Sequence, residues 1–358
     1  MDQKKHDTAL VLQGGGALGA YQAGAIGRLS QEGIFPRHVA GISIGAINAA
    51  LFAGNPPARR AERLEAFWQK ITSATAWPGM SSFGAGIALT MGAPGFFRPR
   101  LLPTMAVADA SQASFYDTGP LRSTLENLVD FDLLNDGSVR FVIGAVDVAT
   151  GNFVWFDNAE QRIRPEHVMA SGALPPGFAP VEIEGRFYWD GGLVSNTPLE
   201  RVVRTRLANR PLVVWQVDLF PAAGAVPRSI WQVEAREKDI RYSSRTRAVT
   251  DWMVHEHDLA VALHSHKDRL PEDFRLHPAI EPLLKAPPPA PLTLIHLIYR
   301  SNPRESGTKD FDFSHDVMML HWSAGAMDVE RTLSHPRLWG HDVDRPGTHV
   351  FDLANVTE

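Results

Sequence analysis

A serine between two glycines is the residue in this sequence that is best placed to act as a nucleophile. Ser43 lies in the pattern G-x-S-x-G, with Gly41 and Gly45 on either side. An apolar run precedes the motif and a run of small residues follows it, which predicts a strand, a sharp turn and a helix. Such a turn projects the hydroxyl at the carboxyl end of the strand. A plain Gly/Ser turn is the alternative for a motif this short.

A second glycine-rich stretch is suited to binding negative charge. Residues 14–19 fit G-x-G-x-x-G, directly after a strand predicted for residues 8–13 and before a predicted helix. Dinucleotide-binding proteins share this pattern, but they require an acidic residue at the end of the second strand. Here that strand runs into Ser43. Free N–H groups at the start of a helix would instead stabilise the oxyanion of a tetrahedral intermediate, so acyl chemistry is favoured over nucleotide binding.

A distant aspartate has the right setting for a base. Asp190 follows a short aromatic strand predicted for residues 187–189 and precedes Gly191 and Gly192. An Asp-Gly pair usually marks only a turn. At a strand end, however, the carboxylate would project at the same sheet edge as Ser43. A free aspartate has a pKa of ~3.9, and burial against the neighbouring aromatic residues would raise it toward neutrality.

The order of these three motifs resembles the patatin-like phospholipases, a family of lipid acyl hydrolases. Residues 170–178 also resemble the segment that leads to the aspartate in that family. The resemblance covers residues 8–207, and the chain beyond residue 229 resembles a C-terminal extension of some bacterial members. It implies an α/β fold of patatin type, with three α/β/α layers, a mostly parallel central sheet and a mainly helical extension. We expect a catalytic domain at 8–220 and the extension, packed on it, at 221–358.

The resemblance also implies a role for each motif. Ser43 and Asp190 would form a Ser–Asp dyad that uses no histidine, metal or cofactor, and the reaction would pass through an acyl-enzyme. The oxyanion loop would comprise Gly14, Gly15 and Gly16. The other motif glycines are Gly19, Gly41, Gly45, Gly191 and Gly192. Leu18 replaces a residue that is basic in many members, which leaves room for neutral esters beside phospholipids.

The expected substrate is a lipid or another aliphatic ester, and two alternatives stay open. An acyltransferase or a hydrolase of neutral or polymeric esters would use the same dyad. A non-catalytic module would use residues 77–102, an apolar segment with almost no charge, to bind lipid or a partner. Apolar surface of this kind tends to mark an interaction site, so we expect either a flap over the active site or a lipid-facing surface. A segment tucked into the core is the third possibility.

Composition excludes several other classes. The chain has 358 residues, 44% of them hydrophobic, and a net charge of −5, which suits a globular protein and argues against nucleic-acid binding. It contains no cysteine, so disulfides and Cys-ligated zinc are excluded. No run approaches the ~18 apolar residues of a spanning helix. We expect a cytoplasmic protein that meets a membrane, if at all, at its surface; the sequence does not indicate the oligomeric state.

Other titratable residues offer weaker alternatives. A later histidine, such as His296 or His321, would complete a catalytic triad. His-x-His pairs in a long helical stretch at residues 229–270 are poor chelates, because residues two apart face different sides of a helix. Turn or strand-end roles are favoured for four further acids, namely Asp109, Asp117, Asp147 and Asp157.

Strands that alternate with helices predict a mostly parallel sheet covered on both faces. Within the stretch at 229–270, the spacing of a set of residues predicts one largely apolar helix face, formed by Val249, Trp252, Glu256, Leu259 and Leu263.

Overall fold

The computed structural model describes residues 6–72, 84–100, 109–206, 210–300 and 308–354. Its centre is a nine-stranded sheet in the order β11-β10-β9-β1-β2-β5-β8-β7, with β6 also paired to β5. Pairing is parallel from β11 to β5 and antiparallel among β5, β6, β7 and β8. The strands before the C-terminal region are β1 (Asp7–Leu12), β2 (His38–Gly41), β5 (Arg140–Asp147), β6 (Phe153–Asp157), β7 (Val181–Ile183), β8 (Arg186–Asp190) and β9 (Leu212–Asp218).

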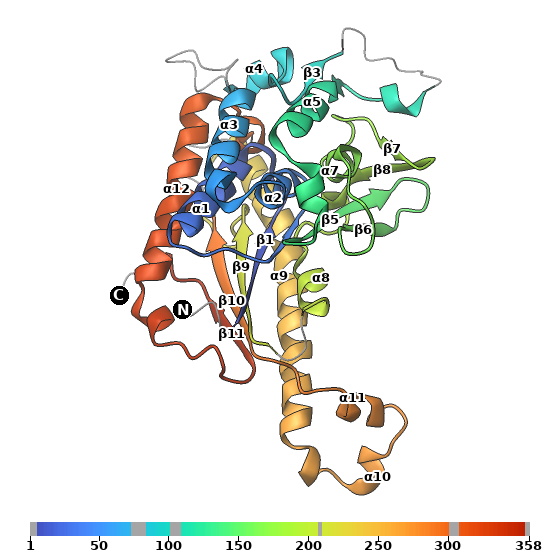
Figure 1. Ribbon diagram of the computed structural model, residues 1–358. Helices are drawn as coiled ribbons and strands as arrows, with labels where there is room; N and C mark the ends of the chain where they lie inside the picture. The colour runs from blue at the N-terminus through green and yellow to red at the C-terminus, as the bar shows by residue number, and fades with distance from the viewer. Residues whose placement is uncertain (1–5, 73–83, 101–108, 207–209, 301–307, 355–358) are drawn as a thin grey trace.

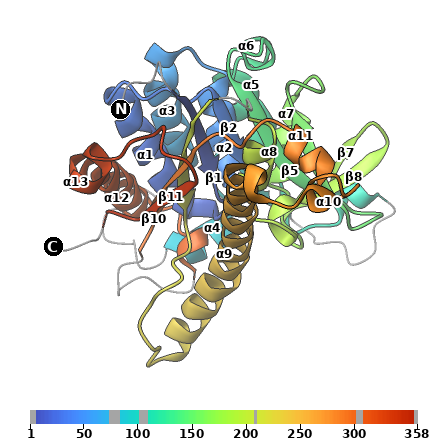
Figure 2. The same ribbon diagram turned by 90° about the horizontal axis from the view of Figure 1, so that it is seen from below.

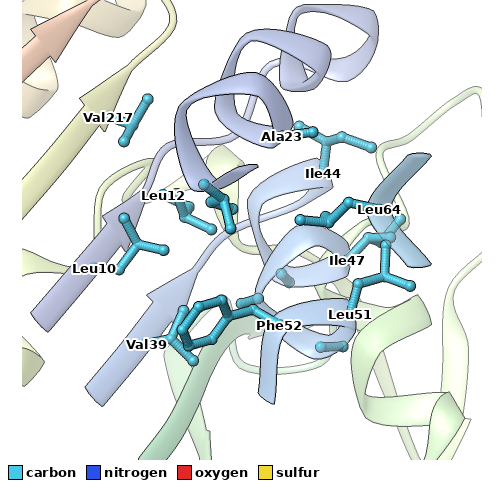
Figure 3. Close-up of a cluster of buried hydrophobic side chains, with 14 of the residues drawn as sticks. Leu10, Leu12, Ala23, Val39, Ile44, Ile47, Leu51, Phe52, Leu64 and Val217 are labelled. Carbon is cyan, nitrogen blue, oxygen red and sulfur yellow. The ribbon is translucent and has the colours of Figure 1, made fainter. Parts of the chain in front are cut away.

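Alternating side chains of β1 divide the core between the two faces of the sheet. Leu10 and Leu12 point toward α1 (Gly19–Gln31), α2 (Ile44–Ala53) and α3 (Arg60–Thr72), where they join the larger hydrophobic cluster (Figure 3). Ala9 and Val11 point the other way, into a cluster with residues of α8 (Leu199–Arg204) and α9 (Ile230–Ser265). Figure 2 shows the sheet between these helical layers. The predicted three-layer α/β/α fold with a mostly parallel sheet is confirmed.

The C-terminal region is mainly helical, as predicted, and it also extends the sheet. Strand β10 (Leu292–Ile298) pairs with β9 along its whole length, and β11 (Thr348–Phe351) pairs with β10. Helix α12 (His315–Ser334) lies along α1 on the outer face (Figure 1). The two parts of the chain therefore share one sheet.

Contact between α1 and α12 is very close. A Cβ atom at Gly24 of α1 would lie 1.9 Å from the carbonyl oxygen of Trp322 in α12. Beside this contact, the Tyr21 hydroxyl donates a 2.7 Å hydrogen bond to the Asp328 carboxylate. Small residues and one buried polar bond thus join the first helix of the chain to the last long one.

Helix α9 is continuous over 36 residues. The prediction of an apolar face on this helix is wrong. Trp252 and Leu259 are 66% and 63% exposed. The buried positions are mostly polar and step by four and three, namely Asp239, Ser243, Thr246, Thr250, Met253 and His257. Polar side chains can face inward here because they find partners: Thr246 accepts from Gln13 at 2.6 Å, and His257 lies 2.8 Å from the Thr348 hydroxyl.

Short elements complete the described chain. They are α4 (Gly84–Met91), β3 (Arg98–Pro99), β4 (Tyr116–Asp117), α5 (Gly119–Leu128), α6 (Phe131–Asn135), α7 (Pro165–Ser171), α10 (Glu272–Arg275), α11 (Glu281–Lys285) and α13 (Pro336–Trp339). Helices α10 and α11 lie at the far end of α9, at the bottom of Figure 1. Among the described helices, none has the length and apolar character needed to cross a membrane.

Candidate active site

Ser43 lies at a sharp turn between β2 and α2. Its backbone has φ 56° and ψ −123°, a left-handed conformation that is unusual for a residue with a side chain. Gly45 must be glycine, because a Cβ atom there would lie 2.4 Å from the carbonyl oxygen of Leu12 in β1. The Ser43 N–H donates to the Ser171 hydroxyl at 3.2 Å. The strand, turn and helix predicted for this motif are present, and the turn holds Ser43 in a strained position.

Asp190 lies at the end of β8 and contacts Ser43. Because β8 pairs with β5, and β5 with β2, the two residues reach the same region of the sheet. The Asp190 carboxylate accepts a 2.7 Å hydrogen bond from the N–H of Gly192. The Ser43 side chain is close enough to stabilise its charged form and so to lower its pKa. The structure therefore brings together the two predicted residues that are most distant in sequence.

Burial shifts the titration of Asp190. The residue is 2% exposed, and burial raises the pKa of its carboxyl group from 3.8 to about 7. The hydrogen bonds from Ser43 and Gly192 oppose this shift, because they stabilise the charged form. The group is thus a much stronger base than an exposed aspartate, in the direction expected from the sequence.

The glycine loop lies directly beside this pair. A Cβ atom at Gly14 would be 3.0 Å from Cβ of Ser43. The N–H of Gly14 already donates to the Asn196 carbonyl at 3.3 Å, and the Asn196 amide donates back to the Gly14 carbonyl at 3.0 Å. Among the described residues, no hydrogen-bond acceptor is found for the N–H groups of Gly15 and Gly16, which lie at the start of a short 3-10 helix. Two of the three predicted loop glycines therefore have a donor to offer to a ligand.

A pocket of about 190 Å³ opens over Ser43, Asp190 and the glycine loop. Its walls are largely apolar and aromatic, with Phe96, Phe97, Tyr116, Phe178, Phe220, Phe311 and Phe313 among the lining residues. The rings of Phe96 and Phe97 lie 5.7 and 6.0 Å from that of Phe313. This cavity can hold an apolar chain beside the serine hydroxyl.

Comparison with protein families gives a clear assignment. A model for patatin-like phospholipases matches residues 10–203, which is more than half of the chain. The chain belongs to the patatin-like phospholipase family. A second model, described as patatin phospholipase, matches residues 240–345, so patatin-related sequence continues into the C-terminal region. No match to a curated protein was found.

The solved structures that match this patatin-like protein share little sequence with it. VipD from Legionella pneumophila is 13% identical, with 90% of this chain and 67% of that chain covered and a TM-score of 0.35. Human GIVD cytosolic phospholipase A2 is also 13% identical, with 60% and 43% covered and a TM-score of 0.36. A chain of the SpcU–ExoU complex from Pseudomonas aeruginosa is 13% identical, with 91% and 77% covered and a TM-score of 0.33. The present chain thus spans less than half of the human protein.

Two positioning residues of this patatin-like site were missed from the sequence. Asn196 is 4% exposed and binds both the N–H and the carbonyl of Gly14. Ser171 links the Ser43 N–H to the Gly144 carbonyl, to which it donates at 2.7 Å. Ser171 falls inside the 170–178 segment that resembles the family, and Asn196 follows Asp190 closely. The position of each residue near a motif could therefore have identified it from the sequence.

The apolar segment at 77–102 contributes to the pocket where it is described. Phe96 and Phe97 are 7% and 5% exposed and form part of its wall, whereas Met91 of α4 is 74% exposed. Residues 77–83 and 101–102 of the segment lie outside the described residues. The described part is therefore partly core and partly surface, beside the active site.

The weaker alternatives lie away from the pocket. No histidine is among its described lining residues; His296 pairs with Asp218 at 3.3 Å, and the buried His321 packs on Tyr299. The other acids hold turns or cations: Asp109 accepts from Ser111, Asp117 and Asp147 pair with Arg98 and Arg186, and Asp157 pairs with Arg140 and Arg201. These contacts support the turn and strand-end roles expected for the four acids.

Proposed function

We propose that this protein is a serine lipid acyl hydrolase in which Ser43 and Asp190 form the catalytic dyad. The observation that carries the proposal is the proximity of the Ser43 side chain to a buried carboxylate, Asp190, in the lining of one apolar pocket. The family membership supports lipid hydrolysis, and the site geometry supports this particular pair of residues.

The reaction would proceed in two acyl-transfer steps. Asp190 accepts the Ser43 proton as the hydroxyl oxygen attacks the ester carbonyl, and the resulting oxyanion accepts hydrogen bonds from the N–H groups of Gly15 and Gly16. The alcohol leaves with the proton held by Asp190, and Ser43 carries the acyl group. Water then attacks the acyl-enzyme and gives one proton to Asp190, which returns it to the Ser43 oxygen as the bond to the acyl group breaks and the carboxylic acid leaves.

The pocket favours a fatty-acyl chain and a headgroup without strong negative charge. Its walls are mostly apolar, and Leu18, at the position that is basic in many relatives, is fully buried. The charged side chains among the described lining residues are both acids, Asp190 and Asp310. No cationic side chain is among the described lining residues to bind an anionic headgroup, so we propose neutral acyl esters as the preferred class.

Labelling with a fluorophosphonate, combined with an ester panel of graded chain length, tests the proposal. The parent should be labelled on Ser43 and hydrolyse medium or long acyl esters, and Ser43→Ala and Asp190→Asn should each lose about a thousand-fold in kcat. Asp109→Asn is the matched control, because Asp109 is exposed and its carboxylate caps a short turn by accepting from the Ser111 N–H. Absence of label in the folded parent would instead favour a non-catalytic binding module. Product analysis with an added alcohol separates hydrolysis from acyl transfer.

A further inference from the structure

The glycine loop is covered by a short turn from the C-terminal region. Residues Lys309–Phe311 form a 3-10 helix, η8, that lies on the loop. The contact is between backbones: a Cβ atom at Gly16 would lie 2.2 Å from the carbonyl oxygen of Asp310. Gly16 has φ +56°, a conformation available mainly to glycine. The position of η8 therefore limits how the Gly16 peptide can turn.

Two ion pairs attach η8 to helix α9. Lys238 reaches both carboxylate oxygens of Asp310, at 2.7 and 3.0 Å. Lys309 reaches the carboxylate of Asp239 at 2.7 Å. The two pairs are reciprocal. Helix α9 contributes the cation Lys238 and the anion Asp239, and η8 contributes the cation Lys309 and the anion Asp310. Lys309 and Asp239 are 3% and 7% exposed, so at least this pair is well shielded from water.

The same segment builds one wall of the pocket. Phe311 and Phe313 line it together with Asp310. The Lys238 ammonium group lies 4.9 Å from the centre of the Phe311 ring, so one lysine contacts both the carboxylate and the aromatic wall. Phe313 packs against Phe96 and Phe97, which also line the pocket. Movement of η8 would change the glycine loop and the acyl pocket together.

We propose that Lys238 and Asp310, supported by Lys309 and Asp239, are positioning residues that hold η8 against the glycine loop and so orient the Gly16 N–H toward the oxyanion. This proposal rests on the proposed function, and it extends the active site to the C-terminal region. Lys238 is partly exposed, but the Asp310 carboxylate that it binds is mostly shielded from water. Loss of Lys238 removes the cation that holds this carboxylate and should release Asp310 and the turn that carries it.

The test compares Lys238→Met with Arg241→Met in the full chain. Arg241 lies about one turn further along α9, where it pairs with Glu237 at the surface. Rates are measured on a short and a long p-nitrophenyl ester and divided by the fraction of Ser43 labelled by fluorophosphonate. An oxyanion donor acts mainly in the transition state, so Lys238→Met should lower kcat roughly ten-fold on both esters, with a smaller change in KM. Arg241→Met should match the parent.

Two further measurements distinguish positioning from mere stabilisation. Amide hydrogen exchange at residues 14–19 should accelerate in Lys238→Met, and Lys238→Arg should restore both kcat and protection. If Lys238→Met does not fold, Asp310→Asn keeps the side-chain volume and should show the same loss of kcat. A kcat per labelled site within two-fold of the parent, in whichever variant folds, would overturn the proposal. A parent that is neither labelled nor active would instead overturn the proposed function.

Discussion

Burial of Asp190 determines how strong a base its carboxylate is. An aspartate of ordinary pKa is a weak base at neutral pH, whereas the buried carboxyl group here has a pKa of about 7. Burial in the protein interior, and not a neighbouring charge, therefore raises the pKa of Asp190. Ser43, half-buried in a strained turn, lines the same pocket as this carboxylate.

The raised pKa predicts the pH dependence of catalysis. Only the deprotonated carboxylate can accept the serine proton, so kcat/KM should rise between pH 5 and 8 with a midpoint near 7. The profile is measured on a neutral ester, with Asp109→Asn as the control that keeps the midpoint. A midpoint near pH 4 would show that Asp190 behaves as an ordinary aspartate and would contradict the prediction.

The same group predicts a cost in stability. Its pKa is raised from 3.8 to about 7 on folding, so between these pH values the unfolded chain releases this proton first. Its contribution to the free energy of unfolding is therefore largest at low pH and is lost as pH rises through about 7. Asp190→Asn removes the buried charge and should gain stability relative to the parent, on the order of 4 kcal/mol at pH 8.

Urea denaturation of both proteins at pH 4 and pH 8 checks this expectation. At pH 4 the carboxyl group is protonated in the folded state, so the two proteins should differ little through this effect. An equal difference in the free energy of unfolding at both pH values would mean that the carboxyl group does not carry the cost.

Among the elements, α9 shows why helix faces are hard to predict from hydropathy. Its inner face is polar, and each buried threonine or histidine that bonds to another element, such as Thr246 or His257, looks like a surface residue in the sequence. Its exposed Trp252 looks like a core residue. In contrast, β1, β9 and α2 were predictable because nearly all of their residues are buried and most of them are apolar.

The contact between α1 and α12 predicts opposite effects for two similar substitutions. Gly24→Ala places a methyl group against the Trp322 carbonyl, at 1.9 Å, and should lower the free energy of unfolding by about 2 kcal/mol. Gly27→Ala, one turn along, meets its nearest atom only at 3.9 Å. The better helix propensity of alanine should make it neutral or stabilising by about 0.5 kcal/mol.

Thermal and urea denaturation of the two alanine variants provide the comparison. Equal destabilisation by both would argue against a specific close approach at Gly24 and would indicate that the whole outer face of α1 is sensitive to added volume.

For the whole molecule, sheet topology explains which parts of the site were predictable. The ends of β1, β2 and β8 meet beside the pocket, so motifs at those three ends could be assigned to one site from their order alone. Asp310 and Phe313 could not, because nothing in their local sequence marks a pocket residue. They reach the site only because α9 and β10 return the chain to it.

The place of β9 inside the sheet has a consequence for dividing the protein. All seven of its residues are buried, with β1 on one side and β10 on the other. A chain ended after Phe220 would leave the hydrogen-bonding edge of this Val- and Trp-containing strand without its neighbour, and bare apolar edges of that kind recruit other chains. We expect residues 1–220 expressed alone to self-associate, which light scattering would detect; a monodisperse, folded fragment would contradict this. The boundary near residue 220 would then divide the sequence, but it would not divide the protein into two domains that are each soluble alone.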